Sequence, residues 1–271
     1  MVPFDNEEII KYFDSCADPN WKILLYGPTG TGKTTFMADL LIASKCRFDE
    51  VFVICNTYAQ DVYDLISFRY NRFYSSALAS KKRKKDEEAA AIERTKCVIS
   101  DLARICYSTA DKKYRVLLIL DDIPETVFSN NKEFSTLIRI SRHNNISIIF
   151  ITHDIIRVES SLRNEFDVFM LTRGKFTIPH QLSQSAWSMC KELNVWISKN
   201  KLPSNYIAML MMILRDGSTS VYAVENNIGK SPIHKALATN TRLIRYIYTK
   251  KSYYFHIRYF DENLINTAMN E

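Results

Sequence analysis

Short apolar runs alternate with helix-length segments along the first two-thirds of the chain. Trp21–Tyr26, Val51–Cys55, Val116–Leu120 and Ile146–Ile151 are apolar almost throughout, and Asp167–Leu171 is a fifth candidate strand. Strands are apolar at nearly every position when helices cover both faces of a parallel sheet. The pattern therefore predicts an α/β protein of three layers, in which a mainly parallel sheet lies between helices.

The segments between these runs predict helices. One helix is expected to run from the loop after the first strand to about Lys45, and another over Lys132–His143. Asp61–Asp111 contains no strand pattern of comparable strength, so we expect this long segment to be mostly helical.

The regular alternation weakens after the fifth run. Gln181–Asn200 predicts a helix, and Tyr206–Leu214 with Ser218–Val224, joined through Asp216-Gly217, predicts a β-hairpin. We therefore expect an N-terminal helical segment at 1–20, a core domain at 21–175, and a C-terminal α/β extension at 176–271 that packs on the core.

The composition is that of a globular protein without a membrane span. Hydrophobic residues make up 46% of the 271 residues. The longest apolar run, Tyr206–Leu214, is well short of the roughly 20 residues that a transmembrane helix needs. The N-terminus is acidic and has no signal-peptide pattern, so we expect a soluble, intracellular protein. The six cysteines form no C-x-x-C motif, which argues against a metal centre or a disulfide framework.

The charge changes this picture only slightly. A formal net charge of +6 permits a polyanionic partner without requiring one. The basic run Lys81–Lys85 is a nuclear-localisation signal, a DNA contact or a solvated helix surface.

A phosphate-binding motif follows the first strand directly. Gly27-Pro-Thr-Gly-Thr-Gly-Lys33-Thr34 matches G-x-x-x-x-G-K-[ST] in full, between a predicted strand and a predicted helix. Its glycines let backbone N–H groups point at phosphate oxygens, and the helix N-terminus adds positive potential. Lys33 is expected to bind the β- and γ-phosphates, and the Thr34 hydroxyl to ligate Mg²⁺. The residues expected to bind the nucleotide are Gly27, Pro28, Thr29, Gly30, Thr31, Gly32, Lys33, Thr34 and Thr35.

Two adjacent acids end the third strand. Asp121 follows the apolar run Val116–Leu120, as in a Walker B strand, and is expected to hold Mg²⁺ beside Thr34. Asp122 comes next and would orient or deprotonate the attacking water. Paired carboxylates at the end of a buried strand are unfavourable unless they serve a cation, so the two motifs together predict nucleotide hydrolysis.

The fourth strand ends in Thr152-His153-Asp154. In P-loop motors a polar side chain at this place lies between the two Walker motifs and senses the γ-phosphate. His153 is the better candidate and Thr152 the alternative, although a lone histidine is also often purely structural. An imidazole in this role would make sensing depend on pH.

Arginines flank the fourth strand. A guanidinium from a neighbouring subunit often neutralises the charge that develops on a transferred phosphoryl group. Arg142 precedes the strand, and Arg157 and Arg163 follow it. Arg142 and Arg163 are the stronger candidates for this trans-acting role, and any of the three could instead pair with a local carboxylate.

These residues together resemble the genome-packaging ATPases of large double-stranded DNA viruses, which belong to the FtsK–HerA superfamily and include the poxvirus packaging ATPase. The resemblance rests on the order strand–GPTGTGKT–helix, on LLILDD, and on RHNNISIIFITHD followed by SLRNEFD, over about Trp21–Leu171. In the wider superfamily the second Walker B acid is usually Glu and the sensor usually Gln. This chain has Asp122 and His153 there.

The resemblance implies an ATP-driven motor, with Mg²⁺ as cofactor, that translocates double-stranded DNA and packages a viral genome into a capsid. It implies a homo-oligomeric ring, a pentamer or hexamer, with capsid or portal-vertex proteins as further partners. The expected locations are the host-cell virus factory, in cytoplasm or nucleus, and the virion. It gives catalytic roles to Lys33, Asp122 and His153, with Arg142 or Arg163 as the arginine finger. Other readings are a helicase loader, an AAA-type remodeller, or a nucleotide-gated scaffold without catalysis.

Overall fold

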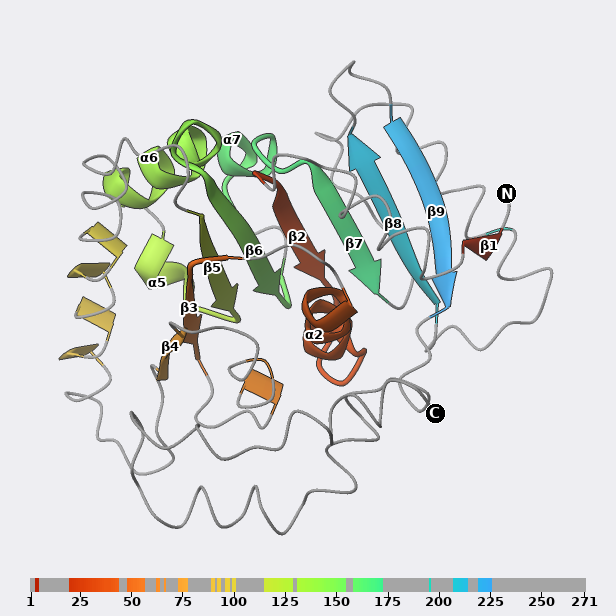
Figure 1. Ribbon diagram of the computed structural model, residues 1–271, viewed down its shortest axis with the longest axis horizontal. Helices are drawn as coiled ribbons and strands as arrows, with labels where there is room; N and C mark the ends of the chain where they lie inside the picture. Colours follow the sequence, from red (N-terminus) through yellow and green to blue (C-terminus); the bar gives the residue numbers. More distant parts are fainter. Residues whose placement is uncertain are drawn as a thin grey trace, which may run out of the picture.

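A mixed β-sheet forms the centre of the part of the chain that the structure describes (Figure 1). The structure is a computed structural model. It describes residues 3–4, 20–43, 48–56, 62–63, 66, 73–77, 89–90, 92–93, 96–97, 99–100, 115–128, 131–154, 158–172, 195, 207–213 and 219–225.

The strands of these residues follow the order β1-β9-β8-β7-β2-β6-β5-β3-β4. From β7 to β4 in this order all neighbours pair in parallel. Strand β8 runs antiparallel to both β7 and β9, and β1 is parallel to β9. The strands are β1 (Pro3–Phe4), β2 (Lys22–Tyr26), β3 (Glu50–Cys55), β4 (Phe73–Ala77), β5 (Val116–Asp121), β6 (Ile146–Thr152), β7 (Val168–Thr172), β8 (Ile207–Ile213) and β9 (Thr219–Glu225).

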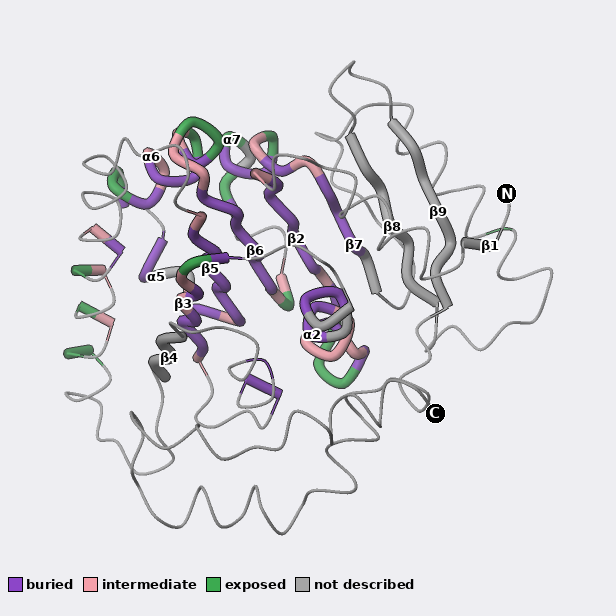
Figure 2. Tube along the Cα trace, viewed as in Figure 1, coloured by how far each residue is buried: buried purple, intermediate pink, exposed green. Residues whose placement is uncertain are grey.

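Helices cover both faces of the parallel strands. The helices are α2 (Lys33–Ala43), α5 (Glu125–Phe128), α6 (Lys132–Ile140) and α7 (Ser160–Arg163). Because successive strand residues point to opposite faces, Ile23 and Leu25 pack with Met37 of α2, whereas Leu24 packs in a separate cluster with Phe134 of α6. Figure 2 shows β2, β3, β5 and β6 buried over most of their length, with exposed residues on the outer helices.

The predicted three-layer α/β arrangement is confirmed for the described residues. Its assignment to the P-loop NTPase folds is a prediction from the motif Gly27–Thr34. Each predicted core strand is present, and its ends differ from the prediction by at most one residue. The predicted hairpin corresponds to β8 and β9, which pair with Ile213 opposite Thr219. Because β8 also pairs with β7, the hairpin continues the core sheet. The helix predicted at Gln181–Asn200 lies outside the described residues except for residue 195.

Two strands differ from the sequence prediction. Strand β4 lies within Asp61–Asp111, which was expected to be mostly helical. Its sequence, FYSSA, has adjacent serines, and it is an edge strand that pairs only with β3, so it lacks the apolar run of a central strand. Strand β1 lies in the segment expected to be helical, and it pairs with β9 over two residues.

The helix predicted at Lys132–His143 is divided in the structure. The Asn131 side chain caps α6 by accepting a hydrogen bond from the Phe134 backbone N–H at 3.0 Å. The α-helix ends at Ile140, and a 3₁₀ turn, η1 (Ser141–Asn144), follows it. Asn145 then adopts a left-handed conformation, with φ of 54°, that directs the chain into β6.

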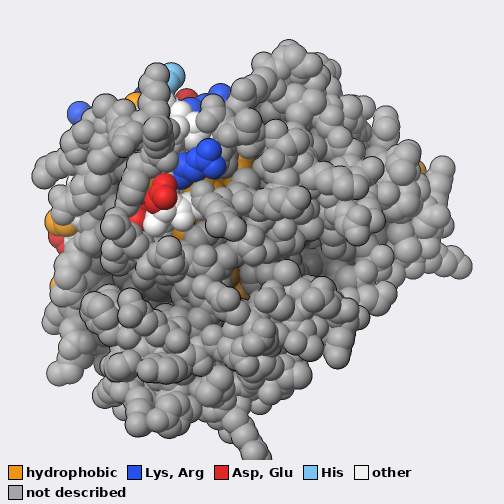
Figure 3. All heavy atoms as spheres, viewed as in Figure 1, with side chains coloured by type: hydrophobic (Ala, Val, Ile, Leu, Met, Phe, Trp, Pro, Cys, Tyr) orange, Lys and Arg blue, Asp and Glu red, His pale blue; other side chains and the backbone are white. Residues whose placement is uncertain are grey.

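Within the described part of the chain, no helix has both the length and the hydropathy to cross a bilayer. On the face seen in Figure 3 the coloured charged side chains are of both signs, and neither sign covers an extended area.

Candidate active site

The phosphate-binding loop lies where β2 ends and α2 begins, at the carboxyl edge of the parallel strands (Figure 1). Gly30 and Gly32 have φ of 75° and 82°, a region that residues with a Cβ rarely adopt. A Cβ on Gly30 would meet nothing within 4 Å, so backbone conformation is what favours glycine there. The Phe36 N–H donates to Gly32 O at 2.8 Å and starts the helix directly after the loop.

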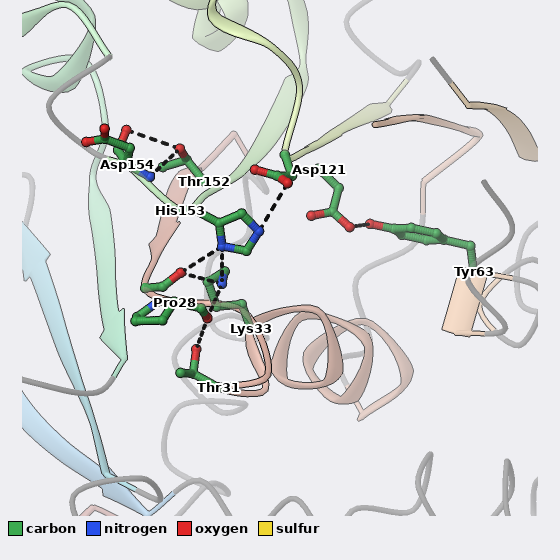
Figure 4. A network of polar contacts seen from close by, with 10 residues as sticks. Pro28, Thr31, Lys33, Tyr63, Asp121, Thr152, His153 and Asp154 are labelled. Atoms are coloured by element: carbon green, nitrogen blue, oxygen red, sulfur yellow. Dashed lines mark hydrogen bonds and ion pairs between the residues drawn. The ribbon is translucent and has the colours of Figure 1, made fainter. Parts of the chain in front are cut away.

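Lys33 is folded back onto its own loop. Its ammonium donates to Gly27 O at 2.5 Å and to Pro28 O at 2.8 Å, and it lies 3.1 Å from His153 Nδ1 (Figure 4). The residue is only 5% exposed. Burial lowers the pKa of Lys33 to about 8, and the charges of Asp121 and Asp122 oppose this fall. The lysine is therefore held by weak, neutral acceptors in a position that phosphate oxygens could take over.

Asp121 and Asp122, at the end of β5, point in different directions. Asp121 is the last residue of the strand and only 4% exposed. Asp122 is partly exposed and has φ of 52°, and its N–H donates to Ile151 O at 2.8 Å. A left-handed aspartate is uncommon, and such residues cluster at functional sites because surrounding structure must hold them. This turn directs the Asp122 carboxylate to His153.

His153 joins the two Walker motifs. Strand β6 lies between β2 and β5, so the residue that follows it emerges between the loop and the paired acids. Its Nε2 is 3.1 Å from Asp122 Oδ2, while Nδ1 faces Lys33. The Lys33 ammonium can only donate to this nitrogen, and Gly27 O, which lies 3.0 Å from the same Nδ1, can only accept. The imidazole ring of His153 thus connects Lys33 with Asp122.

Thr152, the alternative sensor, has local partners. Its hydroxyl donates to Asp154 O at 3.2 Å and accepts from the Asp154 N–H at 3.1 Å. These hydrogen bonds close a turn after β6 and leave His153 as the side chain of this strand end that faces Lys33 (Figure 4).

One residue at this edge was not predicted. The Tyr63 hydroxyl donates to Asp121 Oδ2 at 2.6 Å, and both side chains are buried. No motif in the sequence marks Tyr63, because it lies far from Asp121 along the chain and in a segment without strand pattern.

The candidate arginines lie at the opposite edge of the sheet. Arg142 belongs to η1, directly before β6, and its guanidinium forms an ion pair with Asp167, which directly precedes β7. Arg163 ends α7, which Figure 1 shows where β2, β6 and β7 begin. At about 3.3 Å per residue, the seven residues of β6 separate the two edges by roughly 20 Å. Neither arginine therefore reaches the phosphate-binding loop of its own chain.

The two arginines differ in exposure. The Arg142 side chain is 54% exposed even while it is paired with Asp167. Arg163 is only 6% exposed, and burial lowers the pKa of its guanidinium. Arg157 and the basic run Lys81–Lys85 lie outside the described residues.

The side chains at the carboxyl edge fit a Mg²⁺ ion that arrives with a nucleotide. Among the described residues no cluster of three or more His, Cys, Asp or Glu could hold a metal on its own. Mg²⁺ in nucleotide sites commonly takes one or two protein oxygens and completes its shell with phosphates and water. Asp121 and Thr34 supply oxygens of this kind.

The sequence matches the model of the family described as "Poxvirus A32 protein" over residues 10–237. The chain belongs to this family. The resemblance to poxvirus packaging ATPases is thus confirmed at the level of the family. A comparison with curated proteins finds no match.

Solved structures that are similar over part of the chain include these three. The genome packaging NTPase B204 from Sulfolobus turreted icosahedral virus 2, in complex with ATP-gammaS, is 14% identical over 74% of this chain and 95% of that chain, with a TM-score of 0.45. The cytoplasmic domain of the Thermomonospora curvata type VII secretion ATPase EccC is 14% identical over 75% and 25% of the respective chains, with a TM-score of 0.49. The pCW3 conjugation coupling protein TcpA is 12% identical over 89% and 74%, with a TM-score of 0.48. The family assignment rests on the family model alone.

Proposed function

We propose that this A32-family protein is an ATP-hydrolysing motor that translocates double-stranded DNA and packages a viral genome into a capsid. The observation that carries the proposal is the meeting of Lys33, His153 and Asp122 at one edge of the sheet. On this proposal the protein works as a homo-oligomeric ring with capsid or portal-vertex proteins as partners, in the infected cell and in the virion.

Binding of ATP would exchange the partners of Lys33. The ammonium would leave Gly27 O and Pro28 O for the β- and γ-phosphate oxygens, which are stronger, charged acceptors. The loop N–H groups and the N-terminus of α2 would bind the remaining phosphate oxygens. Asp121 and Thr34 would hold Mg²⁺, which when bound neutralises charge on the phosphates. The Lys33 pKa would rise in this complex, so the lysine would stay charged.

Hydrolysis would then depend on Asp122. Its partly exposed carboxylate can accept a proton from a water at the γ-phosphate or orient that water. His153 would keep this carboxylate in place and would lose its lysine partner when Lys33 moves to the phosphates. The imidazole of His153 therefore links the arrival of the γ-phosphate to the position of the Asp122 carboxylate.

A neighbouring subunit would complete the site. We propose a head-to-tail association in which the amino edge of one sheet meets the carboxyl edge of the next. Of the two arginines, Arg142 can reach a neighbour without unpacking the core, because more than half of its side chain is exposed. We therefore assign the trans-acting role to Arg142, and a structural role to the buried Arg163.

The test of the motor is ATP turnover with and without duplex DNA, over a range of protein concentrations. Turnover that rises with both DNA and assembly is the expected result. Absence of any response to DNA would remove the motor and leave a remodeller or loader, while absence of turnover at every concentration would favour the nucleotide-gated scaffold.

The arginine assignment has its own test. Arg142→Ala should lower turnover about 10³-fold or more, the range found for arginine fingers, while ATP binding persists. Mixing it with Asp122→Asn subunits should restore part of the activity, because some interfaces then contain one intact Arg142 and one intact Asp122. The matched control is Arg139→Ala, an exposed arginine of the same edge that should have little effect. Loss of ATP binding in Arg142→Ala, or no recovery on mixing, would contradict the assignment.

A further inference from the structure

A buried tyrosine holds the Walker B aspartate. The Tyr63 hydroxyl donates to Asp121 Oδ2 at 2.6 Å, a length typical of a hydrogen bond from a hydroxyl to a charged acceptor (Figure 4). Tyr63 is 3% exposed, so water does not compete for this contact. The two residues come from segments that are far apart in the sequence and meet only in the folded protein.

The segment around Tyr63 is anchored in the core. Val62, Tyr63 and Ile66 are buried in the same apolar cluster as Met37 and Leu41 of α2, the helix that begins with Lys33 and Thr34. Tyr63 thus comes from a segment that packs with the helix of the phosphate-binding loop and reaches the end of β5. Its hydroxyl has a fixed position relative to both.

The Tyr63 hydroxyl is the donor in this contact, because a carboxylate oxygen accepts. Burial raises the pKa of Tyr63 well above 10.0, and the nearby charge of Asp121 adds to this effect. Cys55 of β3 pairs in register with Asp121, and burial raises the pKa of its thiol to about 12.

We propose that Tyr63 is a positioning residue that orients the Asp121 carboxylate toward the Mg²⁺ of a bound nucleotide. The inference rests on the proposed function for the presence of Mg²⁺–nucleotide, and it adds a residue that no motif assigns. By holding one carboxylate oxygen, the hydroxyl fixes the plane of the group before the metal arrives. It also helps to stabilise the charge of this carboxylate, which is buried beside apolar strands.

The expected effect is on metal binding. Partners that orient metal ligands typically contribute about 10–100-fold to metal affinity or activity. Tyr63→Phe removes the hydroxyl and little else, so it should raise the Mg²⁺ concentration needed for half-saturation of nucleotide binding about 10-fold or more. Binding of a fluorescent ADP in the presence of EDTA should stay as in the wild-type protein, because that binding uses the loop and Lys33.

The experiment is a Mg²⁺ titration of fluorescent ADP binding to the full chain, with the EDTA measurement in parallel. Cys55→Ala is the matched control, since it disturbs packing beside Asp121 and leaves the Tyr63 hydroxyl in place. In the Asp121→Asn background, Tyr63→Phe should cause no further shift. An unchanged Mg²⁺ dependence, an equal loss of binding in EDTA, or an equal shift in Cys55→Ala would each overturn the proposal.

A second measurement keeps the inference testable if Tyr63→Phe does not fold. A 3-fluorotyrosine placed at position 63 keeps the hydroxyl and reports its surroundings by ¹⁹F NMR. Its resonance should shift when Mg²⁺ is added to the ADP complex, and should not shift in Asp121→Asn. A resonance that ignores Mg²⁺ in the wild-type background would overturn the proposal. Neither measurement needs turnover, so a protein that binds Mg²⁺–ADP but never hydrolyses ATP would remove the proposed motor and leave this inference standing.

Discussion

Two buried lysines flank strand β2, one at its start and one beyond the loop that follows it, and the two are held in different ways. Lys22 begins the strand and is 1% exposed, while Lys33 begins the helix after the loop and is 5% exposed. Burial lowers the pKa of both. Burial and charge by themselves therefore do not distinguish them.

Their partners do. Lys22 donates to Ile138 O at 3.1 Å and forms an ion pair with Glu165 at 3.3 Å. Lys33 donates to carbonyls of its own loop and to an imidazole. A buried ammonium paired with a carboxylate is already satisfied, whereas one held by neutral acceptors gains when anionic phosphates arrive.

The same difference extends to the two edges of the sheet. At the amino edge the ion pairs join neighbouring segments: Lys22 with Glu165, and Arg142 with Asp167. The Asp167 carboxylate also accepts from the Lys22 N–H at 3.2 Å. At the carboxyl edge the polar groups converge on the loop through His153. The amino edge thus fastens β2 to β7 and α6, and the carboxyl edge faces the place where a substrate would bind.

The largest expected effect separates the two lysines directly. Lys33→Met should lower ATP turnover about 10²–10³-fold, because it removes a charge that acts on the transferred phosphoryl group. Lys22→Met, which makes the same change at the other end of β2, should leave turnover within about 3-fold, since its partners lie at the far edge. Steady-state turnover of both variants checks this, and equal losses would break the comparison.

The next effect concerns the residue that connects the carboxyl edge. His153→Ala should lower turnover about 10–100-fold, because a hydrogen bond to a charged group contributes about 1.5–3 kcal/mol. Nucleotide binding in EDTA should change little. His143→Ala, an exposed histidine of the amino edge, is the matched control. Retention of full turnover in His153→Ala would make the contacts of His153 with Lys33 and Asp122 incidental.

A smaller effect tests the amino edge. Glu165→Gln removes the charged partner of Lys22 and should lower the free energy of unfolding by about 1–2 kcal/mol. Breaking a fully buried pair costs about 3–5 kcal/mol, and the 33% exposure of Glu165 reduces this value. Denaturant unfolding of Glu165→Gln and of the exposed Glu159→Gln measures the difference. If Glu159→Gln lowered the free energy of unfolding equally, the ion pair between Lys22 and Glu165 would make no specific contribution to stability.

The smallest effect is a dependence of stability on pH. The folded-state pKa of Lys22 is below its ordinary value of 10.5, so between these two values the unfolded chain binds more protons and Lys22 makes stability rise with pH. Lys22→Met should change the free energy of unfolding by only about 1 kcal/mol near pH 7. The advantage of wild type over Lys22→Met should grow as the pH approaches 10.5. Unfolding curves of the two proteins at several alkaline pH values test this sign, and a constant difference would contradict it.

The sequence predicted the core strands well because each is a compact run of apolar residues with a clear end. It did not predict β4, whose serines suit an edge strand but carry little pattern. It also divided the C-terminal hairpin from the core, although β8 pairs with β7 and continues the same sheet. Periodicity reports the local environment of a segment and says little about which strand lies beside it.

The phosphate-binding loop and the pair Asp121-Asp122 could be identified from sequence because their chemistry lies within a few consecutive residues between a strand and a helix. The tertiary structure decided how these groups meet. Strand order put β6 between β2 and β5 and so placed His153 against both Lys33 and Asp122. Packing of distant segments brought Tyr63 to Asp121, and the parallel direction of the strands put Arg142 at the far edge. Contacts of this kind depend on the pairing of segments that are far apart in the chain, and no local pattern of residues encodes them.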